Sequence, residues 1–198
     1  SFTVIVLFHP RLRSFSTNAY LTTLSLANIV CLINFIFLYS LRYLLSYNSF
    51  RNIITKAPKT SNEINQYENF INLIYGIWSP IFTTFQLFAI YLTCAVTVDR
   101  WIYVTWPLKA DKICSLRNTF IAIGSIFAFC FFYNLPKWFE IESIKHEIKG
   151  PNGTSIVYYK AQLTKIGKHK VFTDIMGRYG YFIFVYGVPF SILLLANV

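Results

Sequence analysis

Charged residues are scarce in this sequence. Asp, Glu, Lys and Arg make up 13% of its 198 residues, whereas a soluble domain usually carries about 25%. Four stretches have no charged side chain at all, namely residues 14–41, 69–98, 118–136 and 179–198. A helix needs about 20 mainly apolar residues to cross about 30 Å of hydrocarbon. Because a chain of this length cannot bury four helices that are apolar all round, the sequence predicts an all-α transmembrane fold.

Motifs for catalysis and for metal binding are also missing. The histidines His9, His146 and His169 are isolated, without a His-Glu-x-x-His or Cys-x-x-Cys spacing. The sequence has no glycine-rich phosphate loop and no nucleophile elbow. We therefore expect no enzyme, no metal and no cofactor. The spans lack ionisable residues at their centres, which a transporter usually needs, although a transporter subunit stays an alternative.

A cleavable targeting segment is missing as well. Residues 1–7, "SFTVIVL", are apolar, but they have no basic leader and no small-residue cleavage site follows them. The last residues, "VPFSILLLANV", stop inside an apolar run. We expect both ends to belong to membrane helices and the chain to be a fragment of a longer membrane protein.

The apolar stretches predict one membrane domain. Its parts are the end of a first helix at 1–8, further helices at 18–46, 70–101, 118–138 and 177–198, and a long polar loop at 139–176. Lys and Arg outnumber Asp and Glu by 18 to 8. They lie in the loops, where the lipid bilayer surface explains them better than nucleic acid does. Asn152 begins a glycosylation sequon, and together with the basic short loops it places the long loop outside the cell.

The longest neutral run ends in two adjacent opposite charges, Asp99 and Arg100. A charge at the bilayer centre costs about 2.5 kcal/mol or more, but this pair stands where the span leaves the lipid. One interpretation is a helix end marked by interfacial charges, with Trp101, Tyr103 and Trp106 as an aromatic belt. The other is a signalling role for the pair.

The order of several motifs favours the signalling role. "DRW" at 99–101 resembles the Asp-Arg-Tyr signature of rhodopsin-like (class A) G-protein-coupled receptors, with Trp101 in the place of the Tyr. Pro107 and Leu108 follow as in the family's second intracellular loop. "TNAYLTTLSLAN" looks like the second-helix pattern and ends at Asn28, and Pro189 matches the fifth-helix proline. The resemblance implies a seven-helix bundle, of which this chain holds the tail of helix 1 through helix 5.

The same resemblance implies roles for the charge pair. Arg100 would contact a heterotrimeric G protein, with Asp99 as its restraint in the resting state and Trp101, Pro107 and Leu108 beside it. An Arg suits this role because it stays charged and presents several donors. A bundle without helices 6 and 7 should not signal, so a non-signalling truncated receptor is a second alternative.

A more specific resemblance lies at residues 133–140. "YNLPKWFE" is similar to the end of helix 4 in invertebrate receptors for FMRFamide-like neuropeptides, with Pro136 as a helix kink. The resemblance implies an extracellular peptide ligand and a receptor of the plasma membrane. The residues expected to line the peptide pocket are Phe82, Thr83, Gln86, Tyr133 and Asn134. Glu140 and Glu142 at its rim would meet the Arg of an Arg-Phe-amide tail.

The sequence departs from the family pattern at several positions. Asn28 and Ala89 replace an Asp and a Ser that hold sodium, so we expect no sodium effect and only helix-to-helix hydrogen bonds from Asn28. Tyr75 stands where a helix-3 Cys is usual, and no Cys follows Cys130. We therefore expect no disulfide and a mobile outer loop. Phe82 occupies the position of the amine receptors' Asp, which disfavours a monoamine ligand.

Overall fold

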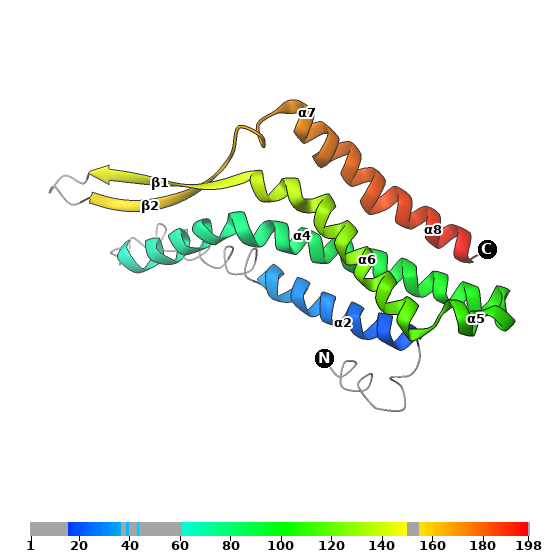
Figure 1. Cartoon of the computed structure of the whole chain (residues 1–198). Coiled ribbons are helices and arrows are strands. Elements are labelled where there is room, and N and C mark those ends of the chain that lie inside the picture. The colour runs from blue at the N-terminus through cyan, green and yellow to red at the C-terminus, as the bar shows by residue number, and fades with distance from the viewer. Residues whose placement is uncertain (1–15, 37–38, 40–42, 44–60, 150–154, 198) are drawn as a thin grey trace. The chain divides into compact units, whose positions relative to one another are not determined.

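The computed structural model describes residues 16–36, 39, 43, 61–149 and 155–197 of the chain. The expected tail of helix 1 at residues 1–8 and the sequon Asn152 lie outside this part. The described residues form mostly helices, which Figure 1 shows in chain order. They are α2 (Ser16–Phe35), α4 (Ser61–Thr105), α5 (Pro107–Ile113), α6 (Leu116–Asn134), α7 (Lys170–Phe172) and α8 (Val188–Asn197).

Four helical segments are long and apolar enough to cross a bilayer. They cover Ser16–Phe35, Asn72–Thr105, Leu116–Phe139 and Lys170–Asn197. Helices suit this environment because each satisfies its own backbone hydrogen bonds, which lipid cannot do. The prediction of an all-α transmembrane fold is therefore confirmed for the spans. The helices α4 and α7 begin earlier than expected, at Ser61 and Lys170 rather than near residues 70 and 177.

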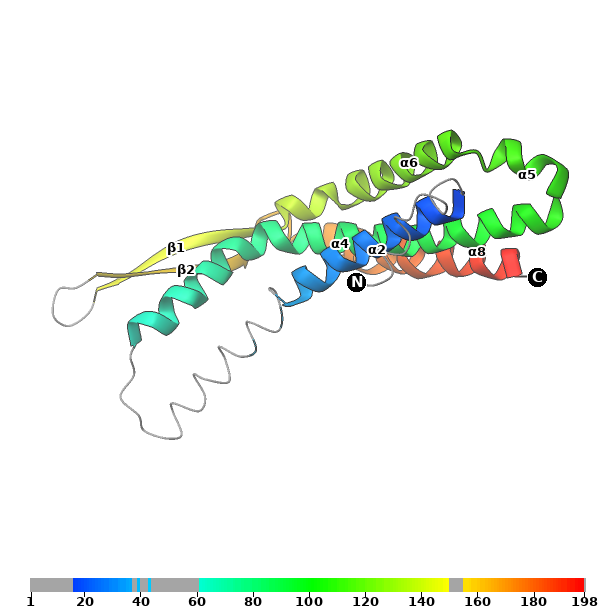
Figure 2. The ribbon, with the colours of Figure 1, turned by 90° about the horizontal axis from the view of Figure 1, so that it is seen from below.

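The chain divides into two compact units, and the first holds the larger part of the helices. It contains residues 16–31, 83–134 and 170–197. Aromatic rings on α4 pack against those on α6, as in the edge-to-face pair of Phe88 and Phe127, whose centroids are 5.3 Å apart. The buried apolar core of this unit consists of Tyr20, Ala27, Leu87, Phe88, Leu92, Val96, Cys130 and Val185. The short α5 turns the chain from the end of α4 into α6 (Figure 2).

The stretch that leads into α8 is wound as a π-helix, over Thr173–Gly180 and Phe182–Gly187. π-Turns, with hydrogen bonds between residues five apart, are rare and occur mostly as single turns inside α-helices. Two features support the winding here. A Cβ on Gly180 would lie 2.6 Å from the carbonyl oxygen of Ile175, so no larger residue fits. The hydroxyl of Tyr91 on α4 donates to the carbonyl of Phe184 at 3.0 Å.

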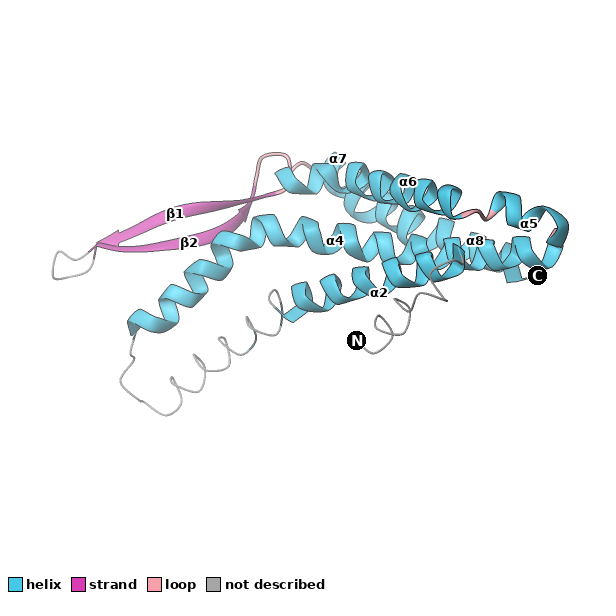
Figure 3. Cartoon of the chain, turned by 60° about the horizontal axis from the view of Figure 1, so that its bottom comes forward, coloured by secondary structure: helices cyan, strands magenta, loops and turns pink. Residues whose placement is uncertain are grey.

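The second unit contains an antiparallel β-hairpin, which Figure 3 shows as a pair of strands. Strand β1 (Ile141–Lys149) pairs with β2 (Ser155–Leu163), with Ile141 opposite Leu163 and Glu142 opposite Gln162. A 3₁₀ turn, η2 (Leu135–Phe139), connects α6 to the hairpin and contains Pro136. The sequence predicts only a polar loop here, because no local pattern indicates the pairing of the two strands.

Candidate functional site

The carboxylate of Asp99 is buried and held by hydroxyl groups of another helix. Asp99 is 5% exposed. Ser16 donates to both carboxylate oxygens at 3.2 Å, and Thr17 donates to one of them at 2.6 Å. Ser16 and Thr17 form the start of α2, where such residues are common because their side chains satisfy free polar groups at helix ends. Hydrogen bonds to an ionised acceptor are stronger than neutral ones, so this contact ties α2 to α4.

Residues from α6 and from the turn before it complete the surroundings of Asp99. The thiol of Cys114 is hydrogen-bonded to the carboxylate. Burial raises the pKa of this thiol to about 12, and the hydrogen bond and negative charge of Asp99 add to the shift. Asn118 donates to the carbonyl oxygens of Lys112 and Ile113 at 3.2 and 3.0 Å, which fixes the end of α5 beside the site.

The side chain of Arg100 has different surroundings from that of its neighbour Asp99. Its side chain is exposed and lines a cleft of about 540 Å³ between the ends of α4 and α8. The other lining residues are Val96, Thr97, Trp101, Val104, Thr105, Ala196 and Asn197. No ion pair in the described part of the chain joins Arg100 to Asp99. In this structure the hydroxyls of Ser16 and Thr17 bind the carboxylate, and the resting-state restraint of Arg100 by Asp99 stays a prediction.

The remaining residues expected to couple to a G protein lie on or before α5. Pro107 begins this helix, a position where its missing N–H leaves no bond unmade. Leu108 follows and is 97% exposed, so its side chain is free to bind a partner. Trp101 and Trp106 pack edge to face with centroids 5.2 Å apart. Arg100, Trp101 and Leu108 thus belong to the same end of the first unit.

The residues expected to bind the peptide fall in both units. Thr83, Gln86, Tyr133 and Asn134 belong to the first unit. The amide of the buried Asn134 donates to the carbonyl of Cys130 in its own helix at 2.9 Å, so it is already engaged. Tyr133 packs against Phe184, with ring centroids 5.1 Å apart.

The other three expected ligand residues belong to the second unit. Phe82 makes an edge contact with Tyr39, at a centroid distance of 6.2 Å. Glu140 precedes the hairpin, and its carbonyl accepts the N–H of Thr164 at 2.9 Å. Glu142 is exposed on β1. A single pocket made by residues of both units stays a prediction.

Hydrogen bonds to α4 anchor the hairpin where the family resemblance would have placed a disulfide. All four cysteines are free thiols. Ser143 on β1 donates to the carbonyl of Asn72 at 2.7 Å, and the Asn72 amide donates to the carbonyl of Tyr159 at 3.1 Å. Gly76 allows close approach, since a Cβ there would lie 3.2 Å from the carbonyl oxygen of Ile141. The mobility expected of this loop stays a prediction, but the sequence analysis missed these anchors.

The structure shows the surroundings of Asn28 and Pro189, two of the residues expected to have a structural role. Asn28 on α2 is exposed rather than packed between helices. Pro189 is buried in α8, and its carbonyl accepts a hydrogen bond from the thiol of Cys94 at 3.8 Å. In the described part of the chain, no group of three His, Cys, Asp or Glu side chains could hold a metal ion.

Comparisons with known proteins give the family. The family model described as "Serpentine type 7TM GPCR chemoreceptor Srw" matches residues 1–196. The chain is 25% identical to an FMRFamide receptor of Drosophila melanogaster over 98% of its own length and 32% of that receptor. It is 27% identical to an FMRFamide peptide receptor of Caenorhabditis elegans over its whole length and 41% of that protein. The chain therefore spans less than half of each relative.

Membership in this family agrees with the four membrane-length helices and makes the chain part of a multi-pass membrane receptor. The resemblance to G-protein-coupled receptors is thereby confirmed, while the rhodopsin-like class is not. An arginine beside a cleft between helix ends and a carboxylate tied to a neighbouring helix lie within the matched region. The chain belongs to the serpentine seven-transmembrane G-protein-coupled chemoreceptor family Srw.

Proposed function

We propose that this chain is part of a plasma-membrane receptor that binds an extracellular FMRFamide-like peptide and activates a heterotrimeric G protein through Arg100. The observation that carries the coupling role is the exposure of Arg100 in the cleft between α4 and α8. A guanidinium that is free of Asp99 can reach a partner that enters this cleft, where it presents several donors at once. The exposed Leu108 on α5 adds an apolar contact beside it.

The ligand proposal rests on the two relatives, which are both named as FMRFamide receptors. A peptide that ends in Arg-Phe-amide carries a guanidinium close to its C-terminus. Glu140 and Glu142 are the acidic residues proposed to meet it through charge-assisted hydrogen bonds. Phe82, Thr83, Gln86, Tyr133 and Asn134 are proposed for the rest of the peptide pocket.

The coupling role predicts a specific loss in Arg100→Ala. The complete transcript that contains this sequence is expressed with a calcium reporter, and amidated peptides are screened for a response. In the responding receptor, Arg100→Ala should lower the response at least about tenfold because an always-charged contact with the G protein is lost. Arg117→Ala is the matched control, since Arg117 is also exposed at the start of α6 and does not line the cleft of Arg100.

Surface expression of both variants is measured with an extracellular tag. Equal signalling by Arg100→Ala and the unchanged receptor, at equal surface levels, would contradict the coupling role. Failure of all amidated peptides, with normal expression, would contradict the proposed ligand class instead.

A further inference from the structure

A second hollow in the first unit has no part in the proposed coupling by Arg100. It is a cavity of about 380 Å³, within the usual range for small-molecule sites. Most of its lining residues belong to α4 and α6. In each helix they recur three or four positions apart, so each helix lines the cavity with one face. The lining residues are Tyr20, Tyr91, Cys94, Ala95, Val98, Asp99, Ile102, Ile113, Cys114, Asn118, Thr119, Ala122, Ile126 and Ile192.

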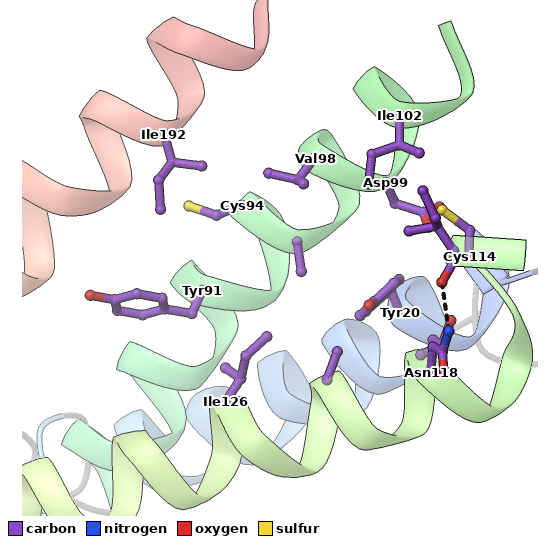
Figure 4. Close-up of a pocket in the computed structure, with 14 residues that line it drawn as sticks. Tyr20, Tyr91, Cys94, Val98, Asp99, Ile102, Cys114, Asn118, Ile126 and Ile192 are labelled. Carbon is purple, nitrogen blue, oxygen red and sulfur yellow. Dashed lines mark hydrogen bonds between the residues drawn. The ribbon is translucent and has the colours of Figure 1, made fainter. Parts of the chain in front are cut away.

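The two ends of this cavity differ in chemistry, as Figure 4 shows. Asp99, Cys114 and Asn118 gather at one end, close to Tyr20. Ile126 and Ile192 lie at the other end together with Tyr91 and Cys94, and this end is mainly apolar because the Tyr91 hydroxyl is bonded to the carbonyl of Phe184. An amphiphilic molecule with its polar group beside Asp99 would match both ends of the cavity.

The carboxylate at the polar end is bound by neutral groups in the described part of the chain. Its hydrogen-bond donors are the hydroxyls of Ser16 and Thr17 and the thiol of Cys114, which are all neutral. In the part of the chain that the structure describes, no Lys, Arg or His forms an ion pair with Asp99. A buried charge attracts an opposite charge strongly because the surroundings screen it poorly. The charge of the cavity thus favours a cationic ligand over a neutral or anionic one.

We propose that this cavity binds a single-chain amphiphile with a protonated amine, and that Asp99 pairs with the ammonium. The apolar chain lies along α6 towards Ile126 and Ile192. This site is separate from the cleft of Arg100 and from the residues proposed for the peptide. The inference rests on the cavity and its charge, and it does not require that the receptor recognise a particular peptide.

Photolabelling of the purified chain in lipid nanodiscs tests the proposal. The probe is dodecylamine with a diazirine near the end of its chain, and the labelled residues are identified by mass spectrometry. Adducts should concentrate on the apolar wall, at Ile126 or Ile192. Unlabelled dodecylamine should displace the probe at a concentration at least about tenfold lower than 1-dodecanol, which has the same chain but no charge.

Substitutions separate the charge from the shape of the cavity. Asp99→Asn should raise the dodecylamine concentration needed for displacement at least about tenfold, whereas the control Asp111→Asn should leave it unchanged. Asp111 is exposed on α5 and does not line the cavity. Ala122→Phe fills the cavity while leaving Asp99 in place, so it keeps the test decisive if Asp99→Asn fails to fold. Equal displacement by the alcohol, adducts spread evenly over the lipid-facing helices, or unchanged displacement in Ala122→Phe would overturn the proposal.

Discussion

A single carboxylate at position 99 organises its surroundings through groups that lie far away in the sequence. Its donors Ser16 and Thr17 stand 83 and 82 positions earlier. Sequence analysis found Asp99 because a charge after a long neutral run is conspicuous. It missed the donors because Ser and Thr are frequent in membrane helices, and only the packing of α2 on α4 selects these two. The receptor resemblance implies that Asp99 holds Arg100 in the resting state, and this pairing stays a prediction, while Ser16 and Thr17 bind the carboxylate in this structure.

The hydroxyl of Thr17 should contribute measurably to stability. Thr17→Val keeps the shape but removes a donor to a buried ionised group, which should lower the free energy of unfolding by about 1.5–3 kcal/mol. Denaturation of the purified chain in mixed micelles measures this change. Thr93→Val is the control, because the exposed Thr93 hydroxyl bonds only the carbonyl of Ala89 in its own helix. Equal effects of the two substitutions would contradict the role of Thr17.

The thiol of Cys114 should be unusually slow to react. Its pKa is raised from 9.0 to about 12, so it stays protonated at pH 8, and iodoacetamide should alkylate it far more slowly than a cysteine in a peptide. The folded protein holds the Cys114 proton more tightly than the unfolded chain does. The resulting contribution to stability is complete below pH 9 and should be lost as the pH rises towards 12. Mass spectrometry of alkylated peptides across this pH range gives the rate. Fast alkylation of Cys114 in the folded protein at pH 8 would contradict the raised pKa of its thiol.

At the scale of elements, the spans were predictable and their connections were not. Length and lack of charge locate a membrane helix, and both are read directly from the sequence. The hairpin depends on the register between β1 and β2 and on the anchors Asn72, Ser143 and Gly76, which no local pattern indicates. The π-helix before α8 could not be predicted from the sequence either, because it depends on the close approach of Gly180 to the carbonyl of Ile175 and on the hydrogen bond from the hydroxyl of Tyr91.

The π-winding makes Gly180 and Gly124 respond differently to the same substitution. Gly180→Ala should destabilise the protein by about 1–3 kcal/mol, since the new Cβ would lie 2.6 Å from the Ile175 oxygen. Gly124→Ala on α6 should be neutral or stabilising by up to about 1 kcal/mol, since a Cβ there meets nothing within 4 Å and Ala favours helix. Micelle denaturation of both variants measures the difference. Similar unfolding free energies would show that the wide turn is not required.

At the scale of the whole molecule, the helices expose most of their apolar surface. Only 11–39% of the residues in the most apolar window of each span are buried within the protein itself. Large side chains such as Leu32, Phe132, Phe182 and Leu195 are more than half exposed. Such surfaces are suited to hydrocarbon rather than to water. The orientation across the bilayer, by contrast, depends on loop charges and on one sequon, and it stays a prediction.

The proposed orientation predicts that Asn152 carries a glycan. Enzymatic removal of N-glycans should increase the gel mobility of the unchanged protein, and Asn152→Gln should remove that difference. A sequon placed in α5 by Lys109→Asn with Asp111→Thr should stay unmodified, because α5 is proposed to face the cytosol. Glycosylation of the α5 sequon, with none at Asn152, would reverse the orientation and remove the basis for coupling through Arg100.

Asp99 and Arg100 are consecutive on one α-helix, so their side chains leave the axis about 100° apart. Because of this angle, Asp99 lines the cavity of Ile126 and Ile192, whereas Arg100 lines the cleft beside Ala196 and Asn197. A rotation of α4 about its own axis that turned the guanidinium towards the hydroxyls of α2 would also swing the carboxylate away from them. A molecule bound in one hollow would therefore affect the side chain in the other, because both residues turn together with one rigid helix. No sliding between helices is needed for this effect.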